Sequence, residues 1–131
     1  MADIDVQEMY KTIDSDLSKI DRNGLPFLLT KNCLNGTGVE IGVWQGRFSD
    51  WILSNSNLSC LISIDPWEAY DTGRLNGKTI SQNAQDRIYQ EAKDLLEKYG
   101  ERSKILKKTS EEAAFQIPCT ANSSSKLSKF S

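Results

Sequence analysis

Residues 38–49 are the stretch that most constrains how this chain can fold. They begin with a short apolar run at residues 39–41, turn at Gly42 and Gly46, and continue from Phe48 with apolar residues at helical spacing. A strand, a glycine-containing turn and a helix in this order are typical of α/β folds that hold a ligand at the end of a strand. The stretch therefore predicts an α/β fold with a ligand beside its glycine turn.

Two further apolar runs give this turn its expected neighbours. Residues 60–64 end in Asp65, which follows Gly42 at about the 20-residue offset at which a βαβ unit presents an acid to a ribose. Residues 104–108 form a third strand candidate, shortly before Ser110. Because parallel strands present their carboxyl ends at one edge, we expect the three strand ends to converge on one ligand. The fold class predicted is a Rossmann-like, doubly wound parallel sheet.

Helical patterns surround the strand candidates. Residues 3–20 carry an amphipathic pattern, and Pro26 opens a shorter helix at residues 27–33. This pair either covers one side of the sheet or forms a lid over the ligand, and covering is the simpler interpretation. The most regular helical pattern runs over residues 80–99, after an expected exposed loop at residues 72–79.

The chain divides into three expected segments. Residues 1–36 form an N-terminal helical cap, residues 37–118 a partial Rossmann-like domain, and residues 119–131 a Ser- and Lys-rich tail. The tail lacks periodicity, so we expect it to be disordered. Before it, Thr109 and the acids that follow are typical of a helix start.

Composition excludes several classes of function. The 131 residues carry a net charge of −2, with Lys and Arg scattered along the chain, so we expect no direct nucleic-acid ligand. Cys33, Cys60 and Cys119 have no CxxC spacing and the chain has no histidine, so neither a disulfide framework nor a metal site is indicated. The N-terminus is acidic and no apolar run approaches the roughly 18 residues of a membrane span. We expect a cytoplasmic protein without a membrane partner.

The spacing of the glycines discriminates among adenosine ligands. A dinucleotide site with the pattern G-x-G-x-x-G would require glycine in place of Trp44 and Arg47, and no Gly-Lys-Ser/Thr closes a P-loop. The pattern E-x-G-x-x-x-G suits S-adenosylmethionine, because this ligand has no phosphate and its positive charges favour a nearby acid such as Glu40. Trp44 lies in the turn, where we expect it to shield the site.

These residues carry a resemblance to a known family. Residues 39–49 and 61–68 resemble the first two motifs of class I S-adenosylmethionine-dependent methyltransferases, particularly the small-molecule group in which a strand ends in Asp-Pro-Trp. Residues 105–113 resemble that group's third strand and the serine after it. The resemblance covers about residues 38–118 and implies the following contacts with S-adenosylmethionine: Glu40, Gly42 and Gly46 at the methionine part, Asp65 at the ribose, and Trp67 and Ser110 at the adenine side.

The chain departs from the family pattern after the third strand. The family continues with a fourth strand that ends in an acidic motif, whereas here Pro118 is followed by the tail. We therefore expect a sheet truncated after its third strand, with an exposed edge that favours self-association or another partner. The region that usually supplies a catalytic base is missing, so no catalytic residue is identified and activity of the chain alone stays open.

Simpler interpretations accompany these assignments. Glu40 and Asp65 could each be structural, and only their joint spacing with the glycines favours a ligand. Trp51 is interpreted as a core residue, because it lies on the apolar face of its helix. The principal hypothesis is a methyltransferase domain, acting on a small molecule that the sequence does not identify and present as its cofactor-binding half. The alternative is a non-catalytic Rossmann-like module for an adenosine ligand or a protein partner, and a nicotinamide-dependent oxidoreductase is disfavoured.

Overall fold

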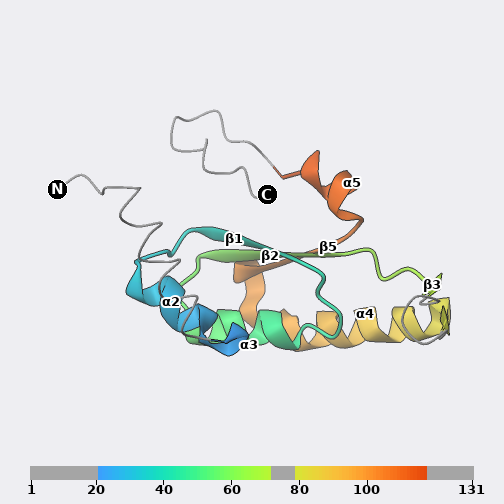
Figure 1. Cartoon of the computed structure of the whole chain (residues 1–131), viewed down its shortest axis with the longest axis horizontal. Coiled ribbons are helices and arrows are strands. Elements are labelled where there is room, and N and C mark those ends of the chain that lie inside the picture. Colours follow the sequence, from blue (N-terminus) through green and yellow to red (C-terminus); the bar gives the residue numbers. More distant parts are fainter. Residues whose placement is uncertain (1–20, 72–78, 118–131) are drawn as a thin grey trace.

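The structure, a computed structural model, describes residues 21–71 and 79–117 (Figure 1). The predicted helix at residues 3–20, the tail at residues 119–131 and most of the predicted loop lie outside these residues. The elements follow one another in this order: η1 (Arg22–Gly24), α2 (Leu25–Lys31), β1 (Thr37–Ile41), α3 (Arg47–Asn55), β2 (Cys60–Asp65), β3 (Tyr70–Asp71), β4 (Thr79–Ile80), α4 (Gln82–Leu96), η2 (Glu97–Arg102), β5 (Ser103–Lys107) and α5 (Ser110–Ala114).

Three parallel strands form the central sheet in the order β1-β2-β5. Ile41 lies opposite Ile64, and Asp65 lies opposite Lys107, so the carboxyl ends of the strands are in register at one edge. Successive crossovers in one direction place their helices on one face, which is where α3 and α4 lie, whereas α5 lies on the other face (Figure 1). The predicted Rossmann-like parallel sheet is confirmed, and β1 and β5 are its edges among the described residues.

The main core lies between the sheet and the helices α3 and α4. It is built from buried aliphatic side chains of α3, of β2 and the segment before it, and of the end of α4: Ile52, Leu53, Leu58, Leu61 and Leu96. Each such side chain contributes about 1.5–3 kcal/mol when it is fully buried. This layer therefore supplies most of the apolar stabilisation that holds the strand ends in place.

The opposite face of the sheet is covered more thinly. Ile62 and Ile64 pack against Ala113 of α5, while Ile41 at the edge of the sheet is 62% exposed. Helix α5 begins with a capping box, in which Thr109 accepts a hydrogen bond from the backbone of Glu112 and the Glu112 side chain accepts one in return. The predicted helix start at Thr109 is confirmed.

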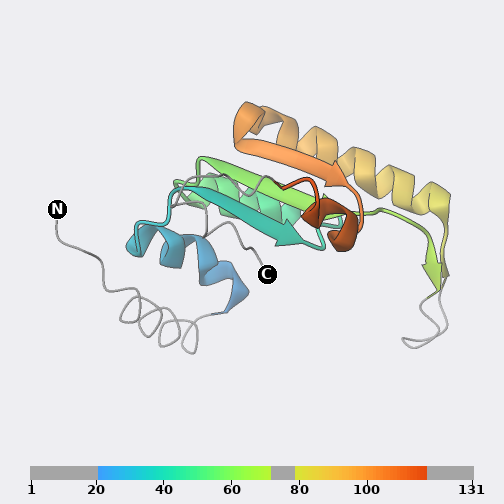
Figure 2. The ribbon, with the colours of Figure 1, turned by 90° about the horizontal axis from the view of Figure 1, so that it is seen from above.

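The short helix α2 begins one residue before Pro26, close to its predicted position. It packs beside α3, as the view from above shows (Figure 2), and the ring of Phe27 meets the ring of Trp51 edge to face at a centroid distance of 6.3 Å. Leu25 and Leu29 pack against the main core. The choice between covering the sheet and forming a lid stays a prediction, because the first helix of the pair lies outside the described residues.

One pairing was not predicted from the sequence. The two-residue strands β3 and β4 pair antiparallel, with Ile80 opposite Tyr70. The prediction that residue 80 already belongs to the following helix is therefore wrong, since α4 begins at Gln82 and is capped by the Ser81 side chain. Strands of two residues are too short to produce an alternating pattern, and an apolar residue just before a helix cap extends the apparent helical period.

Candidate functional site

The three strand ends meet at one edge of the sheet. The backbone N–H of Gly42 donates to the carbonyl of Ile64 at 2.9 Å, and the N–H of Lys108 donates to the carbonyl of Asp65 at 3.2 Å. Ser110 begins α5 just beyond Lys108 and is exposed. The expectation that Gly42, Asp65 and Ser110 lie along one edge is confirmed. Whether they bind a ligand stays a prediction.

The carboxylate of Asp65 holds the glycine turn against β2. Its Oδ2 accepts hydrogen bonds from the N–H groups of Val43 at 2.9 Å and Trp44 at 3.1 Å, and its Oδ1 accepts one from Trp67 at 2.9 Å. A carboxylate offers about four acceptor positions, so these three bonds leave about one. Asp65 therefore has a structural role, as its simpler interpretation stated. Its contact with a ribose stays a prediction, for which about one acceptor position remains.

Trp67 is the largest side chain of the core. It has no accessible surface, its indole N–H donates to the carbonyl of Trp44 at 2.9 Å, and its ring lies 4.8 Å from that of Tyr89 on α4. In this conformation the ring offers no face to an adenine base. An Asp-Pro-Trp sequence after a strand does not indicate this burial, because the turn and α4 that enclose the ring come from distant parts of the chain.

The two glycines of the turn differ in their surroundings. Both have positive φ angles, +85° at Gly42 and +79° at Gly46, which L side chains rarely adopt. A Cβ at Gly42 would meet nothing within 4 Å, whereas one at Gly46 would lie 3.2 Å from the Cα and Cβ of Ala92. Gly46 therefore permits α3 to approach α4 closely, and Gly42 is the glycine with open space for a ligand.

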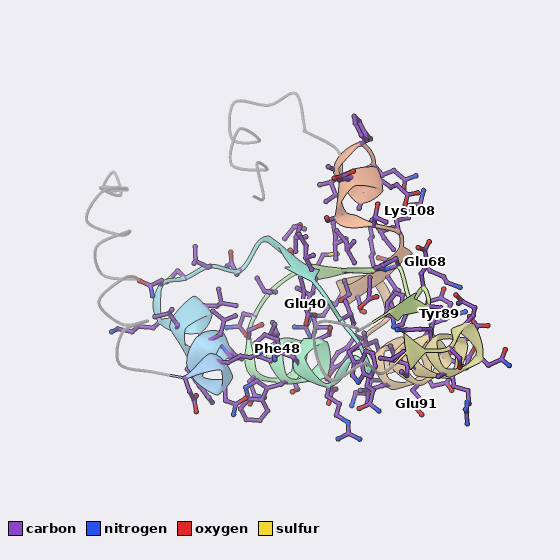
Figure 3. The ribbon with its side chains drawn as sticks, turned by 45° about the vertical axis from the view of Figure 1, so that its right-hand side comes forward. Glu40, Phe48, Glu68, Tyr89, Glu91 and Lys108 are labelled. Atoms are coloured by element: carbon purple, nitrogen blue, oxygen red, sulfur yellow. The ribbon has the colours of Figure 1, made fainter. Side chains whose placement is uncertain are left out.

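Glu40 points beneath the sheet and joins a buried polar chain (Figure 3). Ser49 of α3 donates to its Oε2, and Ser63 of β2 donates to the Ser49 hydroxyl at 3.3 Å. Glu40 is 9% exposed, and its Oε1 is buried without a hydrogen-bond partner among the described residues. A buried carboxylate oxygen without a partner is costly, which makes Glu40 the least satisfied polar group near the turn.

Burial raises the pKa of the Glu40 carboxyl above its usual 4.5. The hydrogen bond from Ser49 and the positive charge of Arg22 lower this pKa in part, and the negative charge of Asp65 raises it further. A cation beside Glu40 would therefore bind more tightly to the ionised form and would bring the pKa down.

A cavity of about 380 Å³ opens beside the turn, between η1, the turn and α3. Its lining combines arginine with aromatic and apolar side chains: Arg22, Val43, Trp44, Arg47, Phe48 and Trp51. Trp44, which we expected to shield the site, is 42% exposed and has a φ angle of +58°. Together with Val43 and Gln45, it belongs both to the turn and to the cavity lining.

Trp51 does not pack in the core, so its interpretation as a core residue is wrong. It is 38% exposed, and its indole N–H donates to the carbonyl of Asn23 at 2.7 Å. Ile52 and Leu53 occupy the buried side of α3 instead. Periodicity identifies the apolar side of a helix but not how far the neighbouring elements cover it, which is why the sequence did not reveal Trp51 or Arg22 as lining a cavity.

The fold and the strand-end geometry define a Rossmann-like α/β protein with a candidate ligand site at the carboxyl edge of its sheet. No protein-family model, curated protein or solved structure matches the chain. Within the described residues, no group of three or more histidine, cysteine or acidic side chains could hold a metal ion. The helices of the same part of the chain are too short or too polar to cross a membrane.

Proposed function

We propose that this chain is an S-adenosylmethionine-dependent methyltransferase domain for a small-molecule acceptor. The observation that carries the proposal is the buried, unpartnered oxygen of Glu40, two residues before the open turn at Gly42. The convergence of three strand ends at the same edge supports it, because open parallel sheets bind ligands there.

The residues around the turn fit this cofactor unevenly. Glu40 fits well, because an ammonium group supplies the hydrogen-bond donor that Oε1 lacks. Oε1 is buried, so this contact requires the Glu40 side chain to move toward the strand-end edge. Asp65 has about one acceptor position left for a ribose hydroxyl, and Ser110 is exposed beside it. Trp67 fits only as a support beneath the turn.

The cofactor would supply a methyl group made electrophilic by the positive charge on its sulfur. The chain would bind and orient the cofactor. Glu40 would contact the ammonium group, and Gly42 would let the backbone approach the ligand closely. Asp65 would hold the turn in place. Methyl transfer depends mainly on alignment of the two reacting groups, so a rigid turn is a useful contribution. No described residue is placed as a catalytic base, and that role stays unassigned.

A second candidate is a non-catalytic Rossmann-like module. The commitment of the Asp65 carboxylate to three backbone N–H groups favours it, because that residue then serves the fold rather than a ribose. In either case we propose a cytoplasmic protein whose exposed β1 edge associates with another copy of the chain. The absence of a strand beyond β1 among the described residues supports the second point.

Isothermal titration calorimetry of the full chain with S-adenosylhomocysteine, NAD and ATP separates the candidates. Heat with S-adenosylhomocysteine alone supports the methyltransferase proposal. Heat with NAD or ATP instead would point to another nucleotide-binding class. Absence of heat with all three would favour an interaction module.

The Glu40→Gln variant tests the role of the buried, unpartnered Glu40 oxygen, since loss of the charge should weaken S-adenosylhomocysteine binding about tenfold or more. Glu101→Gln, at an exposed position in η2, is the matched control and should bind as the unaltered chain does.

A further inference from the structure

The cavity beside the turn has the size and the walls of a small-molecule site. Its volume of about 380 Å³ falls within the roughly 300–1,000 Å³ typical of ligand pockets. Trp44 and Trp51 expose 42% and 38% of their surfaces at its wall, and Phe48 contributes a third ring. Exposed aromatic side chains gathered around one hollow favour a flat, apolar ligand.

The charge at this cavity is positive. Arg22 and Arg47 line it, and no aspartate or glutamate of the described residues does. The Arg22 guanidinium lies 3.8 Å from the centre of the Phe48 ring. In this stacked position the N–H groups at the edge of the guanidinium can donate to a ligand. The Arg47 side chain is exposed and forms no hydrogen bond or ion pair with the rest of the described chain.

The carboxylates near the cavity do not pair with its two arginines. Asp50 pairs with Lys98 at 2.9 Å, and Glu91 accepts a hydrogen bond from Gln45 at 3.3 Å. Glu40 is buried beneath the sheet, where the charge of Arg22 lowers its pKa without a direct ion pair among the described residues. An anion entering the cavity would therefore meet two guanidinium groups, which match the geometry of a carboxylate.

We propose that this cavity binds a planar aromatic molecule that carries a carboxylate, with the rings of Trp44 and Trp51 against its flat body and Arg47 and Arg22 at its charge. Trp44 belongs both to the cavity and to the turn at Gly42, so this molecule is the methyl acceptor. That last step rests on the proposed function, whereas binding of the aromatic carboxylate does not.

The three tryptophan indole N–H groups make the test specific to the site. In ¹H–¹⁵N spectra of the labelled full chain, titration with 2-naphthoate should shift the Trp44 and Trp51 indole signals saturably. The signal of Trp67, whose ring is buried against α4, should shift less than these two, because its hydrogen bond to the Trp44 carbonyl is its connection to the cavity. The neutral analogue 2-naphthamide should bind about tenfold more weakly or worse, because it lacks the charge. Equal binding of the two compounds, or no saturable shift, would overturn the proposal.

Arg47→Gln tests the charged contact directly. This exposed side chain begins α3 and packs against nothing in the core, so the variant should fold. It should lose about tenfold or more in naphthoate affinity, while Arg87→Gln, at an exposed position on α4, should lose none. An unchanged affinity in Arg47→Gln would show that the guanidinium takes no part.

The same spectra separate this inference from the proposed function. S-adenosylhomocysteine should shift the backbone signals of Glu40 and Gly42 and should still bind when naphthoate is present. Naphthoate binding without any response to S-adenosylhomocysteine would leave the aromatic carboxylate site standing and would remove its role as the acceptor site. Competition between the two compounds would also remove that role, because acceptor and cofactor must be bound together.

Discussion

The two carboxylates at the glycine turn lie at similar positions but differ in how far their hydrogen bonding is satisfied. Asp65 ends β2 and accepts hydrogen bonds from three backbone N–H groups, whereas Glu40 in β1 has one buried oxygen without a partner among the described residues. Trp67, beneath the Asp65 side, is fully enclosed, while Trp44 and Trp51, on the side of the cavity, are exposed. The Asp65 side therefore builds the turn, and the unsatisfied groups that a ligand could complete lie on the other side.

The largest expected effect comes from the side that builds the turn. Trp67→Ala removes a fully buried ring and leaves the Trp44 carbonyl without its indole donor, so the free energy of unfolding should fall by about 3–5 kcal/mol. Urea denaturation followed by circular dichroism measures this loss. Trp44→Ala, at an exposed position, should lose less than about 1 kcal/mol. Similar losses of unfolding free energy in the two variants would contradict the distinction between the side that builds the turn and the side of the cavity.

Asp65→Ala should have the next largest effect. Three backbone N–H groups lose a charged acceptor, and because water can reach part of the turn we expect a loss of about 2–3 kcal/mol in unfolding free energy. Binding of S-adenosylhomocysteine, measured by calorimetry on the folded variant, should be abolished. Asp94→Ala on α4, an exposed residue bonded only to Gln90 among the described side chains, serves as the control and should change stability by about 0.5 kcal/mol or less. A fully stable Asp65→Ala chain would mean that the carboxylate does not hold the turn.

The two glycines allow a comparison within the turn itself. Gly46→Ala adds a Cβ 3.2 Å from the backbone of Ala92 at a positive φ angle, so it should destabilise the chain by about 2–3 kcal/mol. Gly42→Ala meets open space and should lose only about 1–2 kcal/mol from its backbone conformation. For S-adenosylhomocysteine affinity the order should reverse, since Gly42 lies on the ligand side. If Gly46→Ala weakened binding more than Gly42→Ala at equal folded fraction, the assignment of the two glycines would be exchanged.

The smallest expected effect on stability is at Glu40. Its raised pKa means that the unfolded chain releases this proton first as the pH rises. Between the ordinary pKa of 4.5 and the higher pKa of the folded chain, the folded state thus binds more protons, and its stability falls as the pH increases. Glu40→Gln lacks this titration, so the variant should gain stability relative to the unaltered chain across that window and hold the gain above it.

Unfolding measured at several pH values tests this, and the shifts at Asp50 and Glu112 cancel because both chains share them. Parallel stability curves for the two chains would contradict a raised pKa at Glu40. A cation-binding role adds an independent readout, because the affinity for S-adenosylhomocysteine should increase as Glu40 ionises and should depend less on pH in Glu40→Gln.

The sequence predicted the architecture well and the individual roles less well. The strands, the helix after the glycine turn and the start of α5 follow from local patterns, which is why their positions agree with the structure to within a few residues. The roles of Trp67 and Trp51 do not follow from local patterns. The first was expected beside a ligand and is buried, and the second was expected in the core and is exposed.

Local sequence patterns alone determined that this chain forms a parallel α/β sheet and that Glu40, Gly42 and Asp65 lie at or beside its strand ends. Tertiary structure decided which of these groups are already satisfied. Whether a carboxylate is free depends on which backbone N–H groups approach it, and those of Val43 and Trp44 reach Asp65 from the turn that follows β1. Periodicity along a chain carries no information about such distant neighbours, because hydrogen bonding and burial arise only when separate elements pack together.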